Sequence, residues 1–188
     1  MQHDKPTILA FVGESGVGKT TLFCALVDAE PGRFAVLRSS MTRSPRLHDP
    51  HESRVHRFLT LEEMEELRSR DAVWVPVNFP QGSHAWYAVQ KADMTAIPEG
   101  VIGCIAFVQS VIEGYRAEGF TVYTVHVLPM NVDQLVDRGD PARTKADAMR
   151  AAVPFKYDFT IENDFSPGGL ERTLGRLRAL VAQLPSTS

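Results

Sequence analysis

Continuous apolar runs alternate along this chain with segments of helical periodicity. Most of the runs are unbroken rather than alternating with polar residues. Unbroken runs of this length are typical of strands that are buried on both faces, as in a parallel sheet. The runs that we interpret as strands are Thr7–Val12, Arg33–Leu37, Ala72–Val77, His84–Val89, Val101–Phe107, Thr121–Val127 and Tyr157–Ile161. The pattern therefore predicts an α/β fold with a mainly parallel sheet.

The segments between these runs carry helix start signals. Thr60 and Glu63 have the spacing of a capping box ahead of a helix over 61–67. Ser166 and Pro167 predict the start of a last helix, in which apolar residues form one stripe over 170–184. Asn131 is a candidate cap for a helix over 132–138. Predicted helices thus lie between some of the predicted strands and after the last one.

The segment between the first strand and the first helix is a complete phosphate-binding loop, Gly-Glu-Ser-Gly-Val-Gly-Lys-Thr. Its glycines allow successive backbone N–H groups to turn inward, and the following helix adds a positive dipole end. We expect Lys19 to reach the β- and γ-phosphates of ATP, and the Thr20 hydroxyl to bind Mg²⁺. A loop of this sequence that has lost binding is the alternative. The expected nucleotide-binding residues are Gly13, Glu14, Ser15, Gly16, Val17, Gly18, Lys19, Thr20 and Thr21.

Composition narrows the class of protein further. With 188 residues, 44% of them hydrophobic, the chain suits one domain with a sizeable core. The net charge is -3 and no block of lysine and arginine stands out, so nucleic acid is not an expected partner. No membrane-spanning run or signal peptide is visible, which points to the cytoplasm. Cys24 and Cys104 lie in apolar segments and are expected to be core residues.

A group of arginines and hydroxyl residues follows the second predicted strand. Segment 38–46 reads Arg-Ser-Ser-Met-Thr-Arg-Ser-Pro-Arg and places Arg43 and Arg46 three residues apart. The planar guanidinium fork suits phosphate, so we interpret the segment as a clamp for a second phosphate group. A solvated basic loop is the alternative. In an α/β fold this segment lies near the carboxyl edge of the sheet, where ligands bind.

These motifs, in this order, resemble the guanylate-kinase family of P-loop phosphotransferases over nearly the whole chain. The shared features are the phosphate loop, the Ser-Ser-x-Thr-Arg-x-Pro-Arg run over 39–46, an aromatic-containing stretch before an acidic helix (56–64), Arg138-Gly139, an arginine-bearing lid, and a Tyr-Asp…Asn-Asp segment over 157–164. The resemblance implies a single domain built on a five-stranded parallel sheet. The core would comprise residues 1–37, 91–135 and 153–188, the acceptor subdomain about 38–90, and the short lid about 136–152.

The resemblance also implies roles for individual residues. Arg43 and Arg46 would hold the acceptor phosphate, and His56 stands where the family has a tyrosine that assists them. Ser39 or Ser40 would lie beside the base or sugar of the acceptor. Trp86 and Tyr87 could stack on a flat base or belong to the core, whereas Trp74 is expected in the core.

Arginines of the lid would complete the catalytic group with Lys19. Arg138, together with Arg143 or Arg150, would close over the transferring phosphoryl group, and the choice between the last two stays open. A helix-end role is the alternative for Arg138.

The chain departs from the family at the carboxylates that read guanine. The strand at 101–107 has no carboxylate, and Val73–Pro76 stands where the family has a glutamate. Asp49 or Glu52 could replace one of these acidic residues, a choice that only loop position suggests. Guanine presents N–H donors, which cost about 1–3 kcal/mol each when buried without an acceptor. GMP is therefore not expected to be the preferred acceptor. The ribose 1,5-bisphosphate phosphokinases also lack these carboxylates, which makes a sugar phosphate the runner-up.

The sequence thus predicts an ATP-dependent kinase that phosphorylates a small phosphate-bearing acceptor, with a nucleoside monophosphate as the first choice. A phosphate acceptor is already ionised, so positioning and charge neutralisation suffice without a general base. The alternatives are a ribose 1,5-bisphosphate phosphokinase, a non-catalytic guanylate-kinase-like binding module, and an ATP-hydrolysing protein that drives a partner. The intact Gly18-Lys19-Thr20 favours the enzyme over the binding module.

Overall fold

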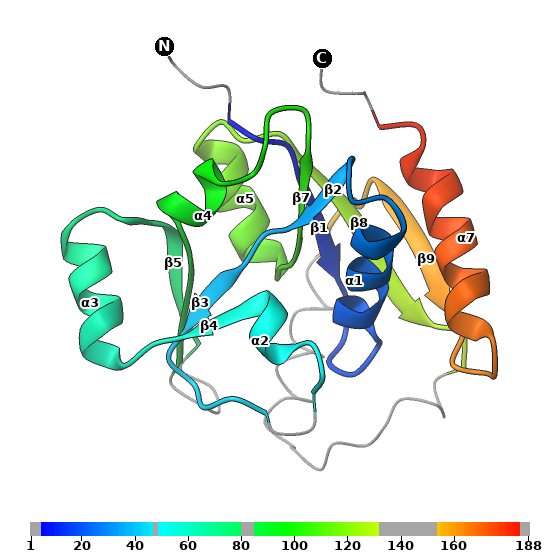
Figure 1. Ribbon diagram of the computed structural model, residues 1–188, viewed down its shortest axis with the longest axis horizontal. Helices are drawn as coiled ribbons and strands as arrows, with labels where there is room; N and C mark the ends of the chain where they lie inside the picture. Colours follow the sequence, from blue (N-terminus) through cyan, green and yellow to red (C-terminus); the bar gives the residue numbers. More distant parts are fainter. Residues whose placement is uncertain (1–4, 47–48, 80–84, 132–153, 185–188) are drawn as a thin grey trace.

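The computed structural model describes residues 5–46, 49–79, 85–131 and 154–184 (Figure 1). A five-stranded sheet has the strand order β2-β7-β1-β8-β9, and every pair in it is parallel. Its strands are β1 (Ile8–Val12), β2 (Phe34–Val36), β7 (Ile102–Ala106), β8 (Val122–Pro129) and β9 (Phe159–Asn163). The predicted α/β fold with a mainly parallel five-stranded sheet is confirmed.

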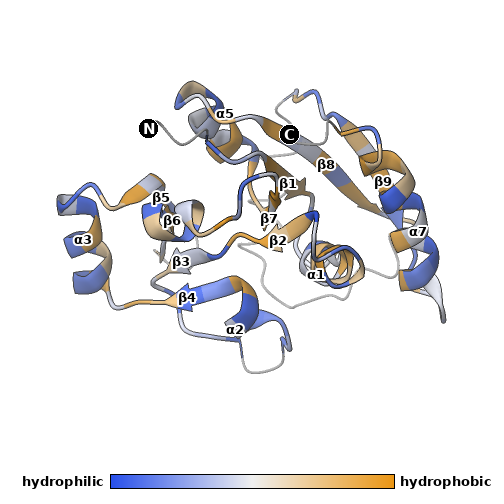
Figure 2. Cartoon of the chain, turned by 45° about the horizontal axis from the view of Figure 1, so that its top comes forward, coloured by the Kyte–Doolittle hydropathy of each residue, from blue (hydrophilic) through white to orange (hydrophobic). Residues whose placement is uncertain are grey.

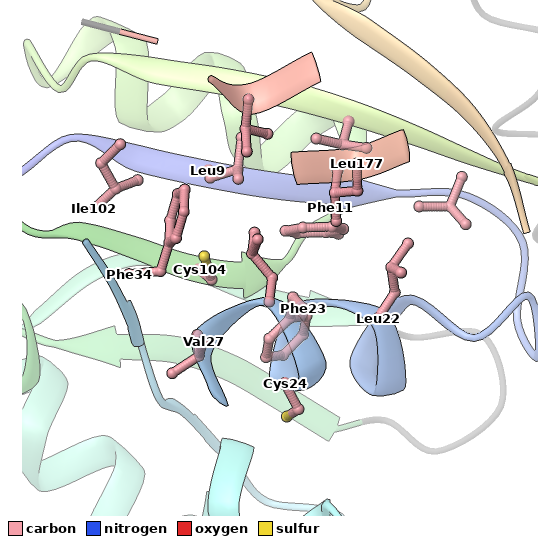
Figure 3. Packing of buried hydrophobic residues seen from close by; sticks show 14 of the residues in the cluster. Leu9, Phe11, Leu22, Phe23, Cys24, Val27, Phe34, Ile102, Cys104 and Leu177 are labelled. Carbon is pink, nitrogen blue, oxygen red and sulfur yellow. The ribbon is translucent and has the colours of Figure 1, made fainter. Parts of the chain in front are cut away.

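Both faces of the parallel sheet are buried, as the unbroken apolar runs predicted. In β1, Leu9 and Phe11 pack in the cluster that contains side chains of α1 (Lys19–Ala29) and α7 (Gly169–Val181). Figure 3 shows this side of the sheet, with Phe11 close to Leu177 of α7. Ile8, Ala10 and Val12 point to the other face, where they join side chains of α5 (Gln109–Ala117). Successive strand residues face opposite ways, so β1 needs apolar residues at every position.

A second, four-stranded sheet lies beside the first and has the order β4-β3-β6-β5. Its strands are β3 (Ser39–Met41), β4 (His56–Phe58), β5 (Val73–Phe79) and β6 (Ala85–Gln90). The helices α2 (Glu52–Val55) and α3 (Leu61–Ser69) join β3 to β4 and β4 to β5, and α4 (Lys91–Thr95) leads from β6 to β7 of the parallel sheet. β3 pairs with β4 in parallel and with β6 antiparallel. The sequence pattern predicted neither β3 nor β4, because each has only three residues and neither is an apolar run.

Of the three predicted helix starts, two lie in the described residues, and the structure confirms one of them. The capping box at α3 is confirmed: the Thr60 hydroxyl accepts a hydrogen bond from Glu63 N, and the Glu63 carboxylate accepts one from Thr60 N. The prediction that Ser166 and Pro167 begin the last helix is wrong by two residues. That helix begins after Gly168, whose positive φ of 70° forms the cap without a side-chain hydrogen bond. The helix proposed over 132–138 lies outside the described residues.

Strand β5 contacts the core through an irregular segment. The β5–β6 register shifts between Trp74 and Val77, and Val75 has a φ of 41°, which is rare for a β-branched residue. A Cβ added to Gly114 of α5 would lie 2.6 Å from Val75 Cγ1, so the glycine leaves room for this side chain. Trp74 packs edge-on against Phe120 in the core, with ring centroids 5.1 Å apart. The segment thus packs the second sheet against α5.

Candidate functional site

The phosphate-binding loop connects β1 to α1, and two of its glycines lie very close to residues of β8 and β9. Gly13 and Gly18 have φ values of 151° and 83°. A Cβ on Gly13 would lie 2.3 Å from the Val127 carbonyl oxygen of β8, and one on Gly18 would lie 2.4 Å from Asn163 Nδ2 of β9. Any other residue at either position would displace the loop, so its shape depends on both the backbone conformation and the neighbouring strands.

Lys19 lies at the first position of α1 with its amine turned back over the loop. Its Nζ donates hydrogen bonds to the carbonyl oxygens of Gly13 at 2.8 Å and Glu14 at 2.6 Å. The amine therefore lies over the loop at the N-terminus of α1, an arrangement that suits the phosphates of a nucleotide. Thr20 and Thr21 follow in the first turn of α1.

A magnesium ion fits this donor set only with few protein ligands. Within the described segments, no group of three or more His, Cys, Asp or Glu residues is arranged to hold a metal ion. The Thr20 hydroxyl would then bind Mg²⁺ together with phosphate oxygens and water, which is common for this ion.

Asn163, the first residue of the Asn-Asp pair noted in the sequence, supports the phosphate-binding loop, a role that the sequence did not indicate. It ends β9, is 5% exposed, and its Nδ2 donates a hydrogen bond to the Val17 carbonyl oxygen at 2.9 Å. The neighbouring Asp164 accepts hydrogen bonds from Ser166 N and from Arg172 of α7, and these lower its pKa to about 2. The Asn-Asp pair thus links the loop to the start of α7.

The carboxyl ends of β7 and β8 present aromatic and amide groups beside the loop. Gln109, at the start of α5, donates from Nε2 to the Tyr157 hydroxyl at 2.6 Å. His126 of β8 stacks on the Tyr157 ring with centroids 4.1 Å apart, and burial lowers the His126 pKa. In the register of the sheet, His126 is opposite Val12, the last residue of β1 before the loop. No spacing in the sequence pairs these residues, which come from three separate elements.

The predicted acceptor residues are sorted by the pleat of the second sheet. Ser39 is opposite His56, and Met41 is opposite Tyr87, which places Ser39, His56 and Tyr87 on one face. Ser39 Oγ and His56 Nδ1 are 2.7 Å apart. Burial lowers the His56 pKa from 6.5 to about 4, against the opposing effect of Glu52, so the ring is neutral near pH 7.

Ser40 and Trp86 lie on the opposite face of this sheet. Ser40 is fully buried and its Oγ accepts a hydrogen bond from Gln90 Nε2 at 2.9 Å. Trp86 packs with the cluster beneath α3, and the Arg68 guanidinium lies 3.8 Å from its ring centroid. The structure therefore does not bring Ser40 and Trp86 together with Ser39, His56 and Tyr87.

Arg43 and Arg46 meet at a buried carboxylate, Glu52, which is one of the two residues that the sequence offered, by loop position, in place of a missing acidic residue. Both terminal nitrogens of Arg43 bond the two Glu52 oxygens, at 2.7 and 3.0 Å. Arg46 N donates to Glu52 Oε2 at 3.2 Å, and Arg46 Nη1 lies 4.0 Å from Oε1. Only a loop position hints at Glu52 in the sequence, since α2 is four residues long.

The Arg43–Glu52 pair is charged despite its burial. Burial alone would raise the Glu52 pKa, but hydrogen bonds from Arg43 and from Arg46 N outweigh it and lower the pKa. Burial would likewise lower the Arg43 pKa, yet its interactions with Glu52 and Tyr87 raise it. The candidate lid residues Arg138, Arg143 and Arg150 lie outside the described residues.

The two cysteines lie where the sequence placed them. Cys24 and Cys104 are buried free thiols within the core, and burial raises the Cys24 pKa to about 11. None of the described helices is long and apolar enough to cross a membrane.

Comparison with known proteins identifies the fold. No protein-family model matches the chain, and no curated protein is significantly similar to it in sequence. Among solved structures, guanylate kinase from Anaplasma phagocytophilum aligns with 97% of this chain and 89% of its own, with a TM-score of 0.70 and 19% identity. A sugar kinase from Janibacter sp. HTCC2649 covers 97% of this chain and 98% of its own, but its TM-score is 0.48, at 16% identity. The chain therefore has a guanylate-kinase-like P-loop kinase fold.

Proposed function

We propose that this protein is an ATP-dependent phosphotransferase that moves the γ-phosphoryl group to a small phosphate-bearing acceptor. The observation that carries the proposal is the presence of two sites suited to anions in one chain. The first is the phosphate-binding loop with Lys19 turned over it. The second is the arginine pair Arg43 and Arg46 around Glu52 of α2. Arg54 of the same helix bonds Asp28 of α1 at 2.9 and 2.6 Å, which holds α2 against α1. Two such sites suit transfer between phosphates better than hydrolysis.

In this proposal, positioning and charge neutralisation account for catalysis. The loop and Lys19 bind the triphosphate, and Thr20 would hold Mg²⁺, which would supply further neutralisation of the phosphate charge. Arg138, with Arg143 or Arg150, closes over the transferring group. Because the acceptor is itself an ionised phosphate, no proton has to be removed from the nucleophile.

A nucleoside monophosphate other than GMP is the acceptor that we place first. Ser39, His56 and Tyr87 share a sheet face that can contact the base or sugar. The nearby Glu52 accepts three hydrogen bonds from Arg43 and from Arg46 N, so its carboxylate is committed to the arginine segment rather than to a base. β7 ends at Ala106, and the residues that follow it, Phe107 and Val108, also carry no carboxylate.

A sugar phosphate is the second candidate acceptor, and the same acid-poor strand end favours it. Sugar hydroxyls can be read by groups that both donate and accept, such as Ser39, Tyr87 and the Gln109 amide. A base-reading carboxylate is not needed for such an acceptor.

An assay of ADP release from ATP and Mg²⁺ tests the proposal directly. The acceptors to compare are GMP, dGMP, AMP, UMP, CMP, dTMP and ribose 1,5-bisphosphate. We expect at least one nucleotide other than GMP to raise ADP release above the acceptor-free rate. Stimulation by the sugar bisphosphate alone would select the second candidate. If ATP binds and none of the acceptors stimulates release, the kinase proposal loses to the non-catalytic binding module.

A further inference from the structure

Arg43 and Arg46 differ in their surroundings, although the sequence presents them as an equivalent pair. The Arg43 side chain is 11% exposed, and its two terminal nitrogens are bonded to Glu52. One of them also donates to the Ser44 carbonyl oxygen at 2.8 Å. The Arg46 side chain is 36% exposed, and its guanidinium is 4.0 Å from Glu52. The Arg46 side chain is therefore more accessible to an anion arriving from solvent than the Arg43 side chain.

Glu52 also fixes the backbone from which Arg46 projects. Its Oε2 accepts the Arg46 N–H at 3.2 Å while the same oxygen bonds Arg43 Nη1. The carboxylate thus connects the main chain at residue 46 to the side chain at residue 43. Losing it would leave Arg43 as a buried unpaired charge and would free the Arg46 backbone.

The element that carries Glu52 is anchored on both sides. Arg54 of α2 makes its paired bonds to Asp28 of α1, and Val55 is buried in the core cluster that includes Cys24 and Val27 of α1. His56 follows at once and contacts Ser39. With its side chain only 6% exposed and its helix held at these points, Glu52 is not placed to swing away when an anion binds.

We propose that Glu52 is a positioning residue that divides the arginine pair, so that Arg46 binds the acceptor phosphate and Arg43 serves as its internal support. The inference deepens the proposed function and rests on it for the identity of the anion. It predicts that Glu52 helps acceptor binding. The opposite arrangement, in which Glu52 is an internal competitor that the acceptor displaces, would place the phosphate on Arg43.

Arginine side-chain NMR with inorganic phosphate as the probe separates these arrangements without requiring turnover. The Nε–H resonances are assigned with Arg43→Lys and Arg46→Lys variants. We expect the Arg46 resonance to shift saturably in the wild-type chain while the Arg43 resonance stays in place. A shift of Arg43 as large as that of Arg46 would overturn the proposal, and so would the lack of a response from both. A phosphate response without any acceptor-dependent ADP release would leave the division standing and reject the proposed function.

Steady-state kinetics with Glu52→Gln then tests positioning. Gln keeps the shape of the side chain but removes the charge that holds Arg43. We expect the acceptor KM to rise roughly 10- to 100-fold, as displaced binding groups typically cause, while the KM for ATP stays near its wild-type value. Glu66→Gln is the matched control, because the Glu66–Arg70 pair is 63% exposed on both sides. A lower acceptor KM in Glu52→Gln would show that Glu52 competes with the acceptor and would overturn the proposal. Should Glu52→Gln fail to fold, the wild-type titration still decides.

Discussion

The nucleotide half and the acceptor half of this molecule are held in shape by different interactions. Around the phosphate-binding loop, glycines with positive φ and buried parallel strands set the geometry. In the second sheet, ion pairs between distant residues do so: Arg43 with Glu52, Arg54 with Asp28 and Arg57 with Asp93. Figure 2 shows the same contrast as colour, with the central strands of the parallel sheet mostly orange and β4 and α2 mostly blue.

This difference determines what can be read from a sequence. Backbone conformation and burial produce local sequence patterns, such as a glycine spacing or an apolar run. A charged pair between two elements produces no such pattern, because either partner alone resembles an ordinary surface residue. We therefore expect the two halves to respond differently to substitution and to pH.

The largest expected effect concerns the nucleotide half. Lys19→Ala should reduce ATP turnover by roughly 10³-fold, about 4 kcal/mol, because it removes the cation that stabilises the transferring phosphates. Circular dichroism should show an intact fold. Lys91→Ala is the control, since Lys91 pairs with the exposed Asp71. Unchanged turnover in Lys19→Ala would show that the loop takes no part in the reaction, and the first half could then not be called the nucleotide half.

Two glycine substitutions test whether packing on β9 adds to backbone strain. Gly18 and Gly119 have nearly the same φ, 83° and 82°. A Cβ on Gly119 meets only Lys5 Nζ at 3.9 Å, whereas one on Gly18 meets Asn163 Nδ2 at 2.4 Å. Gly119→Ala should cost about 1–2 kcal/mol of the unfolding free energy, and Gly18→Ala about 1–3 kcal/mol more. Denaturant unfolding measures both, and equal losses would contradict the role of Asn163.

In the acceptor half, the depressed pKa of His56 should appear as a pH dependence of stability. The unfolded chain binds this proton below pH 6.5, whereas the folded chain binds it only below about pH 4. Unfolding therefore takes up a proton in this window, and stability falls as the pH falls. Between pH 7 and pH 5 the loss is roughly 2 kcal/mol. Denaturant unfolding of wild type and His56→Asn at both pH values should show that the variant loses less, and an equal loss would refute the burial of a neutral ring.

The smallest effect sharpens the comparison by testing a local feature within the acceptor half. Thr60→Ala removes one partner of the capping box at α3 and should cost about 1 kcal/mol of stability. Ser69→Ala is the matched control at the other end of the same helix, where the hydroxyl bonds the Glu66 carbonyl oxygen at an exposed position. Thermal unfolding of both variants should separate them. If Thr60→Ala is as stable as the control, the capping box does not contribute to the free energy of unfolding, and local sequence signals do not stabilise this helix.

Much of the fold could be predicted because its strands are long, apolar and buried. All seven predicted strands are present, with ends shifted by a few residues. β3 and β4 were missed because three residues such as Ser-Ser-Met or His-Arg-Phe become strands only through pairing with neighbours. The start of α7 was misplaced because Gly168 forms the cap by its backbone conformation alone.

The candidate site was less predictable than the fold. The phosphate-binding loop could be recognised because its residues form one continuous segment of the sequence. In contrast, the roles of Asn163, Glu52 and the His126–Tyr157 stack depend on contacts across separate elements. Two choices were left open: that between Ser39 and Ser40, and that between base stacking and core packing for Trp86 and Tyr87. Both depend on the pleat of a sheet that the sequence did not reveal. Arg43 and Arg46 looked equivalent because no local pattern shows that Glu52 bonds the side chain of only one of them closely.

The measurement that tests the central claim most directly follows a radioactive label from the γ-phosphate of ATP in a single turnover. Our account predicts that, with a phosphate-bearing acceptor present, the label is recovered on that acceptor, and that Lys19→Ala prevents the transfer. Recovery of all the label as inorganic phosphate, at a rate that no acceptor changes, would contradict it.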